Sequence, residues 1–338
     1  MESVVLVTGA AGFIGLHMCR RLKDRGIRVR ALLRTVSSGP WDESALCRLG
    51  QDPLPQGLMD GVDTVFHLAG VAHSFKPTKE MEHIYWSVNL EATQSLLSMA
   101  RAAGVSRFIF FSSIKAMADP GDRCVDEKWN VIPDDVYGRS KREAEQWVSS
   151  AGESGRMHVC NLRPVLVYGP GVKGNLLRMM KAIDNNRFPP VPETGNRRSL
   201  VHVEDLIQAA FLAAENENAD KRTYIVTDAR DYSTHELYQY MCTALGKRAP
   251  QWTVPAGIFR LAGHAGDLAG RILGRPFPMN TEAVDRLLGS ACYSCDRIRE
   301  ELGYTPARDF LSAIGEMVQW YRKPVIEKNS RGDVGPDR

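Results

Sequence analysis

Residues 4–15 read VVLVTGAAGFIG, an apolar run that ends in a glycine-rich turn. The apolar run predicts a buried strand, and each glycine stands where a side chain would clash with a pyrophosphate or with the packing of the next helix. Backbone amides at the N-terminus of that helix can hold a pyrophosphate. The residues expected to contact a dinucleotide in this turn are Gly9, Gly12, Phe13, Ile14 and Gly15.

Apolar strands alternate with amphipathic helices through the first half of the chain. Strands are predicted at residues 4–7, 29–33, 62–68 and 108–111, and helices at 13–25 and 89–103. This alternation predicts an α/β fold of the Rossmann type, a doubly wound parallel sheet with helices on both faces. Ligands of such sheets bind beyond the carboxyl ends of the strands, where Gly9, Ala69 and Ser113 fall.

Glycine and proline become frequent after residue 162, and the regular alternation weakens. We therefore expect a smaller C-terminal substrate-binding lobe that is interleaved with the first domain. The predicted division is a dinucleotide-binding domain at 1–165 with returning segments near 200–230, a substrate lobe at 166–322 and a polar tail at 323–338.

Residues 258–273 are apolar at helical spacing, although charged and polar residues interrupt them. The interrupting residues are Arg260, His264, Asp267 and Arg271. This pattern favours a helix packed on the protein over one that contacts a membrane.

The composition excludes several classes of protein. A net charge of +3, with both signs interspersed, argues against a nucleic-acid or membrane-binding patch. The chain has no N-terminal leader pattern and no run of 18 apolar residues, so we expect a cytoplasmic protein. Seven scattered cysteines predict reduced packing residues, with no disulfide framework and no metal site.

Tyr137 and Lys141 are four residues apart. On a helix this spacing places both on one face, where the ammonium can lower the pKa of the phenol and make it a proton donor. A pair of solvated surface residues is the alternative. The serine pair Ser112 and Ser113 precedes them, after the glycine turn, and this order indicates hydride transfer at a carbonyl.

Arg34 stands at the end of the second predicted strand, where NAD-preferring sites usually have a carboxylate that binds the ribose hydroxyls. A guanidinium suits a 2′-phosphate. The cofactor is therefore expected to be NAD(P), with NADP(H) favoured over NAD(H), although Arg34 could instead stack on the adenine.

These motifs, with further ones along the chain, resemble those of the extended short-chain dehydrogenase/reductases, the NAD-dependent epimerase/dehydratase family. The resemblance covers residues 1–322 and includes HLAG at 67–70, Asn89, RP at 163–164 and YGPG at 168–171. The strings FSSIK at 111–115, YGPGVKGN at 168–175 and NRRSLV at 196–201 resemble a narrower bacterial group. Its members reduce or epimerise C4 of UDP-N-acetyl-hexosamines in surface-polysaccharide biosynthesis.

The resemblance implies roles for matching residues. Tyr137 would be the acid and base, Lys141 would lower its pKa and hold the nicotinamide ribose, and Ser113 would bind the reacting oxygen. Further cofactor contacts would come from Asp52, Leu68, Ala69, Gly70, Asn89 and Pro164. Substrate contacts would come from Asn175, Arg198 and Arg286 at the diphosphate, and from Lys115 beside the serine. Lys115 and Arg286 have the alternatives of a solvated loop lysine and a surface helix charge.

Two departures from the family pattern narrow the reaction. Ile114 and Lys115 replace the Asp-Glu pair that 4,6-dehydratases need to eliminate water, so dehydration is not expected. Leu166 stands where galactose-type epimerases carry asparagine. We therefore expect reduction of a UDP-4-keto-(6-deoxy)-N-acetyl-hexosamine. The alternatives are a UDP-sugar 4-epimerase with bound NAD, a reductase of small hydrophobic carbonyls or hydroxysteroids, and a dinucleotide-binding protein without turnover.

The resemblance also implies a homodimer through the helices near Asn89 and Tyr137. The sugar and its C4 stereochemistry are not determined by the sequence.

Overall fold

The computed structural model describes residues 3–71, 79–153, 155–274, 277 and 279–323. The predicted polar tail, apart from Lys323, lies outside these residues.

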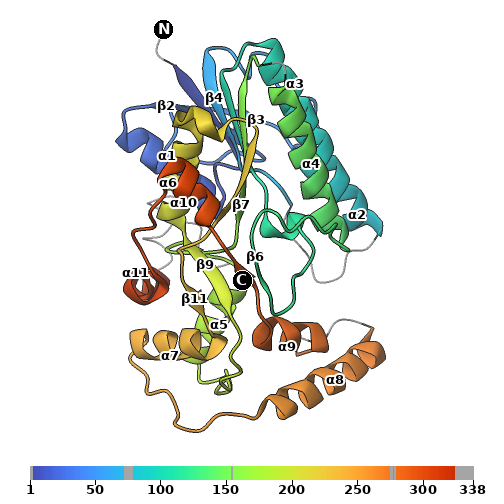
Figure 1. Ribbon diagram of the computed structural model, residues 1–338, viewed down its shortest axis with the longest axis vertical. Helices are drawn as coiled ribbons and strands as arrows, with labels where there is room; N and C mark the ends of the chain where they lie inside the picture. Colours follow the sequence, from blue (N-terminus) through green and yellow to red (C-terminus); the bar gives the residue numbers. More distant parts are fainter. Residues whose placement is uncertain (1–2, 72–78, 154, 275–276, 278, 324–338) are drawn as a thin grey trace.

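A seven-stranded parallel sheet forms the centre of the molecule, in the order β10-β7-β5-β4-β1-β2-β3 (Figure 1). Its strands are β1 (Val4–Thr8), β2 (Arg28–Leu33), β3 (Glu43–Leu46), β4 (Val62–His67), β5 (Arg107–Phe111), β7 (His158–Pro164) and β10 (Arg222–Val226). The strand order reverses at β1, which pairs with both β2 and β4. The fold is therefore Rossmann-like, as predicted, with its topological switch point beside the glycine turn.

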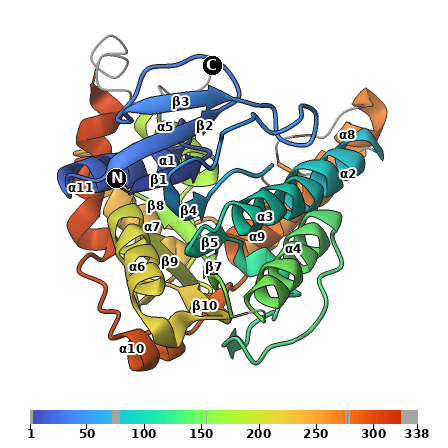
Figure 2. The ribbon, with the colours of Figure 1, turned by 90° about the horizontal axis from the view of Figure 1, so that it is seen from above.

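Helices cover both faces of this sheet (Figure 2). One face carries α2 (Lys79–Tyr85), α3 (Ala92–Ala102) and α4 (Val136–Gly152), and the other carries α1 (Phe13–Asp24) and α6 (Val203–Glu215). A separate hydrophobic cluster fills each interface, with Leu96 and Val148 in one and Met18 and Leu206 in the other. Burial on both faces explains why the central strands read as continuous apolar runs.

The second half of the chain adds smaller units, most of them beyond the carboxyl ends of the main strands (Figure 1). A three-stranded sheet contains β8 (Leu166–Tyr168), β9 (Arg198–His202) and β11 (Asp231–Tyr232), and a two-stranded sheet contains β6 (Cys124–Val125) and β12 (Cys292–Tyr293). The remaining helices are α5 (Asn175–Asp184), α7 (Thr234–Ala244), α8 (Ala256–Leu273), α9 (Thr281–Leu288), α10 (Asp296–Leu302) and α11 (Phe310–Arg322). The division into lobes at residue 165 stays a prediction.

Two elements differ from expectation. The edge strand β3 was not predicted, because its residues are only partly buried or exposed and carry no apolar run. The segment 258–273 is helical, but most of its large apolar side chains are exposed, so packing explains only one side of α8. Among the described residues, no helix combines the length and the hydrophobicity needed to cross a membrane.

Candidate active site

The glycine turn after β1 is too crowded for side chains. Gly9 has φ +69°, and a Cβ there would lie 2.9 Å from the amide nitrogen of Ala69. A Cβ at Gly15 would lie 2.2 Å from the carbonyl oxygen of Gly9. No side chain caps the N-terminus of α1, and its first turn contains no acidic residue. These features fit the pyrophosphate of a dinucleotide, which the amides and the helix dipole would hold.

A buried hydrogen-bond chain fixes the loop that faces this turn. The Thr8 hydroxyl lies 2.6 Å from His67 Nδ1 and accepts a hydrogen bond from the Ala69 amide. His67 Nε2 lies 2.8 Å from the hydroxyl of Thr93 on α3. Burial lowers the pKa of His67 to about 3, so this histidine is neutral and acts as a structural link.

Asn89 and Lys141 meet at Gly70. The Asn89 side chain accepts from the Val71 amide at 2.9 Å and donates to the Ser140 hydroxyl at 3.2 Å. A Cβ at Gly70 would lie 3.1 Å from Asn89 Oδ1 and 3.2 Å from Lys141 Nζ. The loop after β4, which contains Leu68, Ala69 and Gly70, is thereby held between the glycine turn and α4.

The three predicted catalytic residues lie together at the carboxyl end of β5. Asp135 caps α4 by accepting from the Gly138 amide at 2.8 Å, which places Tyr137 in the first turn of the helix. A hydrogen bond joins Tyr137 to the side chain of Ser113. Lys141, one turn further along α4, donates from Nζ to the Phe111 carbonyl at 3.0 Å.

Burial is the largest cause of the pKa shifts of Tyr137 and Lys141. It raises the pKa of Tyr137 to about 12, against the lowering effect of the hydrogen bond from Ser113. It lowers the pKa of Lys141 to about 8, although Glu145 opposes this shift. Desolvation of the phenol outweighs the hydrogen bond from Ser113, so the net shift of the Tyr137 pKa is upward. The lowering of this pKa by Lys141 stays a prediction.

Three further predicted cofactor residues lie at the carboxyl ends of main-sheet strands. Arg34 directly follows β2 and is exposed. Asp52, in the loop after the neighbouring β3, accepts from the Arg48 amide at 2.8 Å. Pro164 is the buried last residue of β7. Their contacts to a cofactor stay predictions.

Two further predicted substrate residues lie in a 3-10 turn and at the start of a helix. Lys115 is half-buried in the single 3-10 turn after β5, and its amide donates to Ser113 Oγ at 3.1 Å. Asn175 is the exposed first residue of α5 and follows Gly174, which has φ +74°.

The structure brings Arg198 and Arg286 together. Arg198, the first residue of β9, donates from Nη1 to the carbonyl oxygens of Arg286 at 2.7 Å and Gly289 at 3.0 Å. Arg286 lies in α9 and forms an ion pair with Glu282. Burial lowers the pKa of Arg198, and the charge of Arg286 lowers it further. Both residues are half-buried. Their binding of the substrate diphosphate stays a prediction.

Comparison with known proteins identifies the family of this chain. The model of the NAD dependent epimerase/dehydratase family matches residues 5–227. The chain belongs to this family.

Some relatives and solved structures match this chain over nearly its whole length. A UDP-glucose 4-epimerase of Vibrio cholerae is 30% identical, covering 98% of each chain. A 3 beta-hydroxysteroid dehydrogenase/Delta 5-->4-isomerase of Mycobacterium tuberculosis is 26% identical, covering 94% of this chain and 90% of its own. The structure of MoeE5 in complex with UDP-glucuronic acid and NAD has the same fold, with a TM-score of 0.74, 22% identity and coverage of 95% and 99%.

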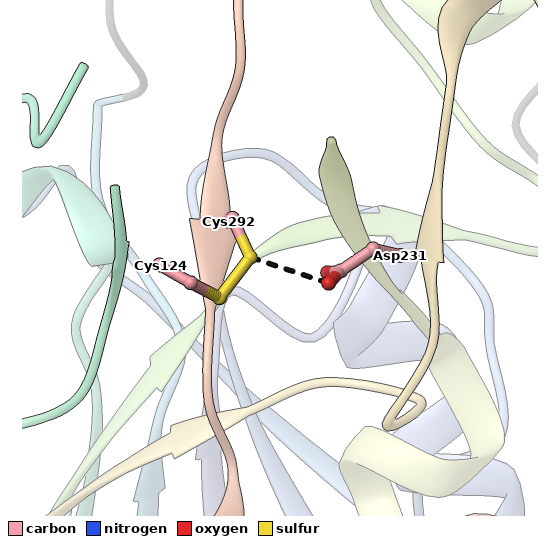
Figure 3. A group of neighbouring side chains, drawn as sticks. All are labelled: Cys124, Asp231 and Cys292. Carbon is pink, nitrogen blue, oxygen red and sulfur yellow. Dashed lines mark hydrogen bonds between the residues drawn. A yellow bond between two sulfur atoms is a disulfide. The ribbon is translucent and has the colours of Figure 1, made fainter. Parts of the chain in front are cut away.

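One feature of this epimerase/dehydratase protein corrects the cysteine prediction. Cys124 in β6 and Cys292 in β12 form a disulfide, with Asp231 beside it (Figure 3). The other five cysteines are free and buried, as expected. The three ligand atoms of Cys124, Asp231 and Cys292 lie within 4.8 Å of one another, but the bonded sulfurs provide no thiolate for a metal.

Sequence reasoning also missed residues that support the catalytic group. The buried ring of Tyr85 lies 5.7 Å from that of Tyr137. Glu145 accepts two hydrogen bonds from Arg163, at 2.8 and 2.6 Å, on the buried side of α4 below Lys141. Glu145 lies four residues after Lys141 and could have been found from the helical spacing. Tyr85 carries no local signal of its role.

Proposed function

We propose that this protein transfers hydride at C4 of a UDP-linked sugar, and that it reduces a UDP-4-keto-(6-deoxy)-N-acetyl-hexosamine with NADPH. The observation that carries the proposal is the group of Ser113, Tyr137 and Lys141 beside the glycine turn, in which Tyr137 and Lys141 are buried. The V. cholerae relative, a UDP-glucose 4-epimerase, supports chemistry at C4 of a UDP-sugar.

The three residues divide the proton chemistry. A bound reduced nicotinamide supplies the hydride to the carbonyl carbon. Tyr137 is protonated at neutral pH because burial raises its pKa, so it can donate the phenolic proton to the carbonyl oxygen. Ser113, already hydrogen-bonded to Tyr137, holds the same oxygen. Lys141 in its cationic form stabilises the tyrosinate that remains.

The diphosphate of the substrate binds to Arg198 and Arg286. Guanidinium groups make paired hydrogen bonds to phosphate oxygens. The Arg198 guanidinium already contacts the backbone of Arg286, so the two residues are neighbours. Asn175 contributes an amide donor, and Lys115 contributes a cation beside Ser113. A hydroxysteroid carries no phosphate, so a reductase of hydroxysteroids would not need these charges. Such an activity is still an alternative, because the M. tuberculosis relative is a 3 beta-hydroxysteroid dehydrogenase/Delta 5-->4-isomerase.

Arg34 binds the 2′-phosphate of NADP(H). Its exposed position after β2 leaves the guanidinium accessible to the cofactor's adenosine ribose. MoeE5 has NAD in its complex, so NAD is the competing cofactor.

The second candidate is a UDP-sugar 4-epimerase, which the similarity to the V. cholerae enzyme favours. Purified protein should be incubated with a UDP-4-keto-sugar and NADPH, and separately with UDP-N-acetyl-hexosamines. A reductase consumes one equivalent of NADPH and gives a product two mass units heavier. Tightly held NAD and interconversion of C4 epimers without net cofactor change would establish the epimerase. If the protein turns over a steroid and UDP does not inhibit this turnover, the protein is a hydroxysteroid reductase.

A homodimer through α4 is also part of the proposal. Ile132 and Trp147 line a hollow on the outer side of this helix, and their side chains are 64% and 52% exposed. Trp147→Asp should convert the dimer to a monomer in analytical ultracentrifugation, and an unchanged mass would place the interface elsewhere or show a monomer.

A further inference from the structure

Helix α8 presents an unusual exposed apolar stripe. Its members are spaced by three and four residues, so they lie on one side of the helix. They are Ile258 (55% exposed), Leu261 (69%), Leu268 (59%) and Ile272 (77%), with the exposed Ala265 between them. Large contiguous apolar surfaces of this kind mark interaction sites.

The opposite side of α8 is fixed to the start of α9. Phe259, Gly263 and Gly266 are buried there. A Cβ at Gly266 would lie 1.6 Å from the carbonyl oxygen of Met279, so the two segments are in direct backbone contact. This packing fixes which side of the helix faces the protein. The stripe is thus held facing outward, at the end of the molecule away from the main sheet (Figure 1).

The exposed arginines beside the stripe, Arg260 and Arg271, are cationic. Arg260, His264 and Arg271 are exposed on a third side of the helix. The only carboxylate in α8, that of Asp267, is half-buried and accepts a hydrogen bond from Thr281 at 2.7 Å. Two copies of α8 that paired through their stripes would therefore bring arginines together without carboxylates from either helix. An anionic surface complements the same charges.

We propose that α8 docks the protein on the surface of an anionic lipid bilayer. The stripe enters the boundary between headgroups and acyl chains, while Arg260 and Arg271 bind lipid phosphates. The segment that leads into α8 runs along the same end of the molecule, and its Trp252 is 64% exposed, as suits a residue at a membrane interface (Figure 1). The helix lies in the interface and does not span the bilayer, in accord with its charges and the absence of a membrane-crossing helix among the described residues.

Flotation of the full chain with vesicles tests the proposal. Wild-type protein should float with vesicles of phosphatidylcholine containing about a third phosphatidylglycerol, and less with phosphatidylcholine alone. Leu261→Gln and Leu268→Gln should each lower the bound-to-free ratio about tenfold, the effect of withdrawing one buried leucine from an apolar environment. Arg260→Gln with Arg271→Gln should remove the preference for anionic vesicles.

Leu311→Gln provides the matched control. Leu311 lies on α11 and is 51% exposed, so the substitution removes the same side chain from another surface. It should leave flotation unchanged, and thermal melts should show that all variants fold. Wild-type protein that stays with the soluble fraction would overturn the proposal. So would a dimer that Leu261→Gln and Leu268→Gln convert to monomers without any vesicle binding, because a second copy would then cover the stripe.

Discussion

Cys124 and Cys292 are joined by a disulfide across 168 residues of chain. Cys124 lies in the segment that connects Ser113 to Tyr137. Cys292 lies in β12, which adjoins the start of β9 at Arg198. The bond therefore links the segment between Ser113 and Tyr137 to the strand next to Arg198.

Reduction of this bond should destabilise the protein. The chain-entropy model gives a disulfide that closes so long a loop about 5 kcal/mol of stability, because it restricts the unfolded chain. We expect thermal melts of the wild type to shift to lower temperature in a dithiol reductant, and Cys124→Ser to reproduce the shift. The reductant should have no further effect on Cys124→Ser. A wild-type melt indifferent to reduction would contradict the prediction.

Tyr137→Phe should lower turnover by about two to four orders of magnitude, since it removes the phenolic proton and keeps the ring. Cofactor affinity, measured by nicotinamide fluorescence, should change little. Tyr85→Phe is the matched control, because it removes a neighbouring buried hydroxyl that has no proposed proton role. More than a tenth of wild-type turnover in Tyr137→Phe would exclude this residue as the proton donor.

Local patterns predicted the parts of the site that a few residues determine. The glycine turn follows from steric limits within a dozen residues, and the common face of Tyr137 and Lys141 follows from helical geometry. The ionisation of the phenol does not, because desolvation depends on everything packed around it. The spacing of Tyr137 and Lys141 therefore gave no indication that burial raises the pKa of the phenol.

Contacts between residues far apart in the sequence could not be predicted. The Cys124–Cys292 bond depends on two short strands meeting, and neither cysteine has a neighbouring residue pattern that indicates its partner. The apolar period of α8 predicted a helix with an apolar face. Only the tertiary arrangement determines that Gly263 contacts α9 and Gly266 contacts Met279 before it, while Leu261 and Leu268 are exposed.

Arg198→Ala should make the binding free energy of UDP less favourable by about 1.5 to 3 kcal/mol, the range for hydrogen bonds to a charged group. Inhibition by UDP should weaken accordingly. Arg198 also donates hydrogen bonds to the carbonyl oxygens of Arg286 and Gly289. Arg198→Lys keeps the positive charge but not these bonds, so it distinguishes the effect of the charge from that of the structural contacts. We expect Lys to recover part of the affinity, and NADPH binding to stay nearly constant in both variants. Calorimetric titration with UDP measures the difference, and unchanged affinity in Arg198→Ala would make the residue purely structural.

Arg34→Asp should reverse the preference between the two cofactors. A carboxylate repels the 2′-phosphate of NADP(H) and can accept hydrogen bonds from the ribose hydroxyls of NAD(H). The ratio of kcat/KM for NADPH to that for NADH should fall well below one. Equal losses of kcat/KM with both cofactors would mean that Arg34 stacks on the adenine and does not bind the 2′-phosphate.

Lys141 should make activity and stability respond to pH in opposite directions. Burial lowers its pKa from the ordinary value of 10.5 to about 8, so the ammonium that stabilises the tyrosinate is lost as the pH rises through about 8. The rate of hydride transfer in a single turnover should fall over the same range. Lys128→Met, which removes an exposed lysine, should leave this profile unchanged.

The stability effect of Lys141 follows from the same shift. Because the folded protein binds this proton less tightly than the unfolded chain does, the ammonium costs stability below pH 8, and the cost disappears between about pH 8 and 10.5. Lys141→Met should therefore be inactive yet melt at a higher temperature than the wild type at pH 7, with a smaller difference at pH 9.5. A melting difference that does not change with pH would show that Lys141 titrates normally in the folded protein.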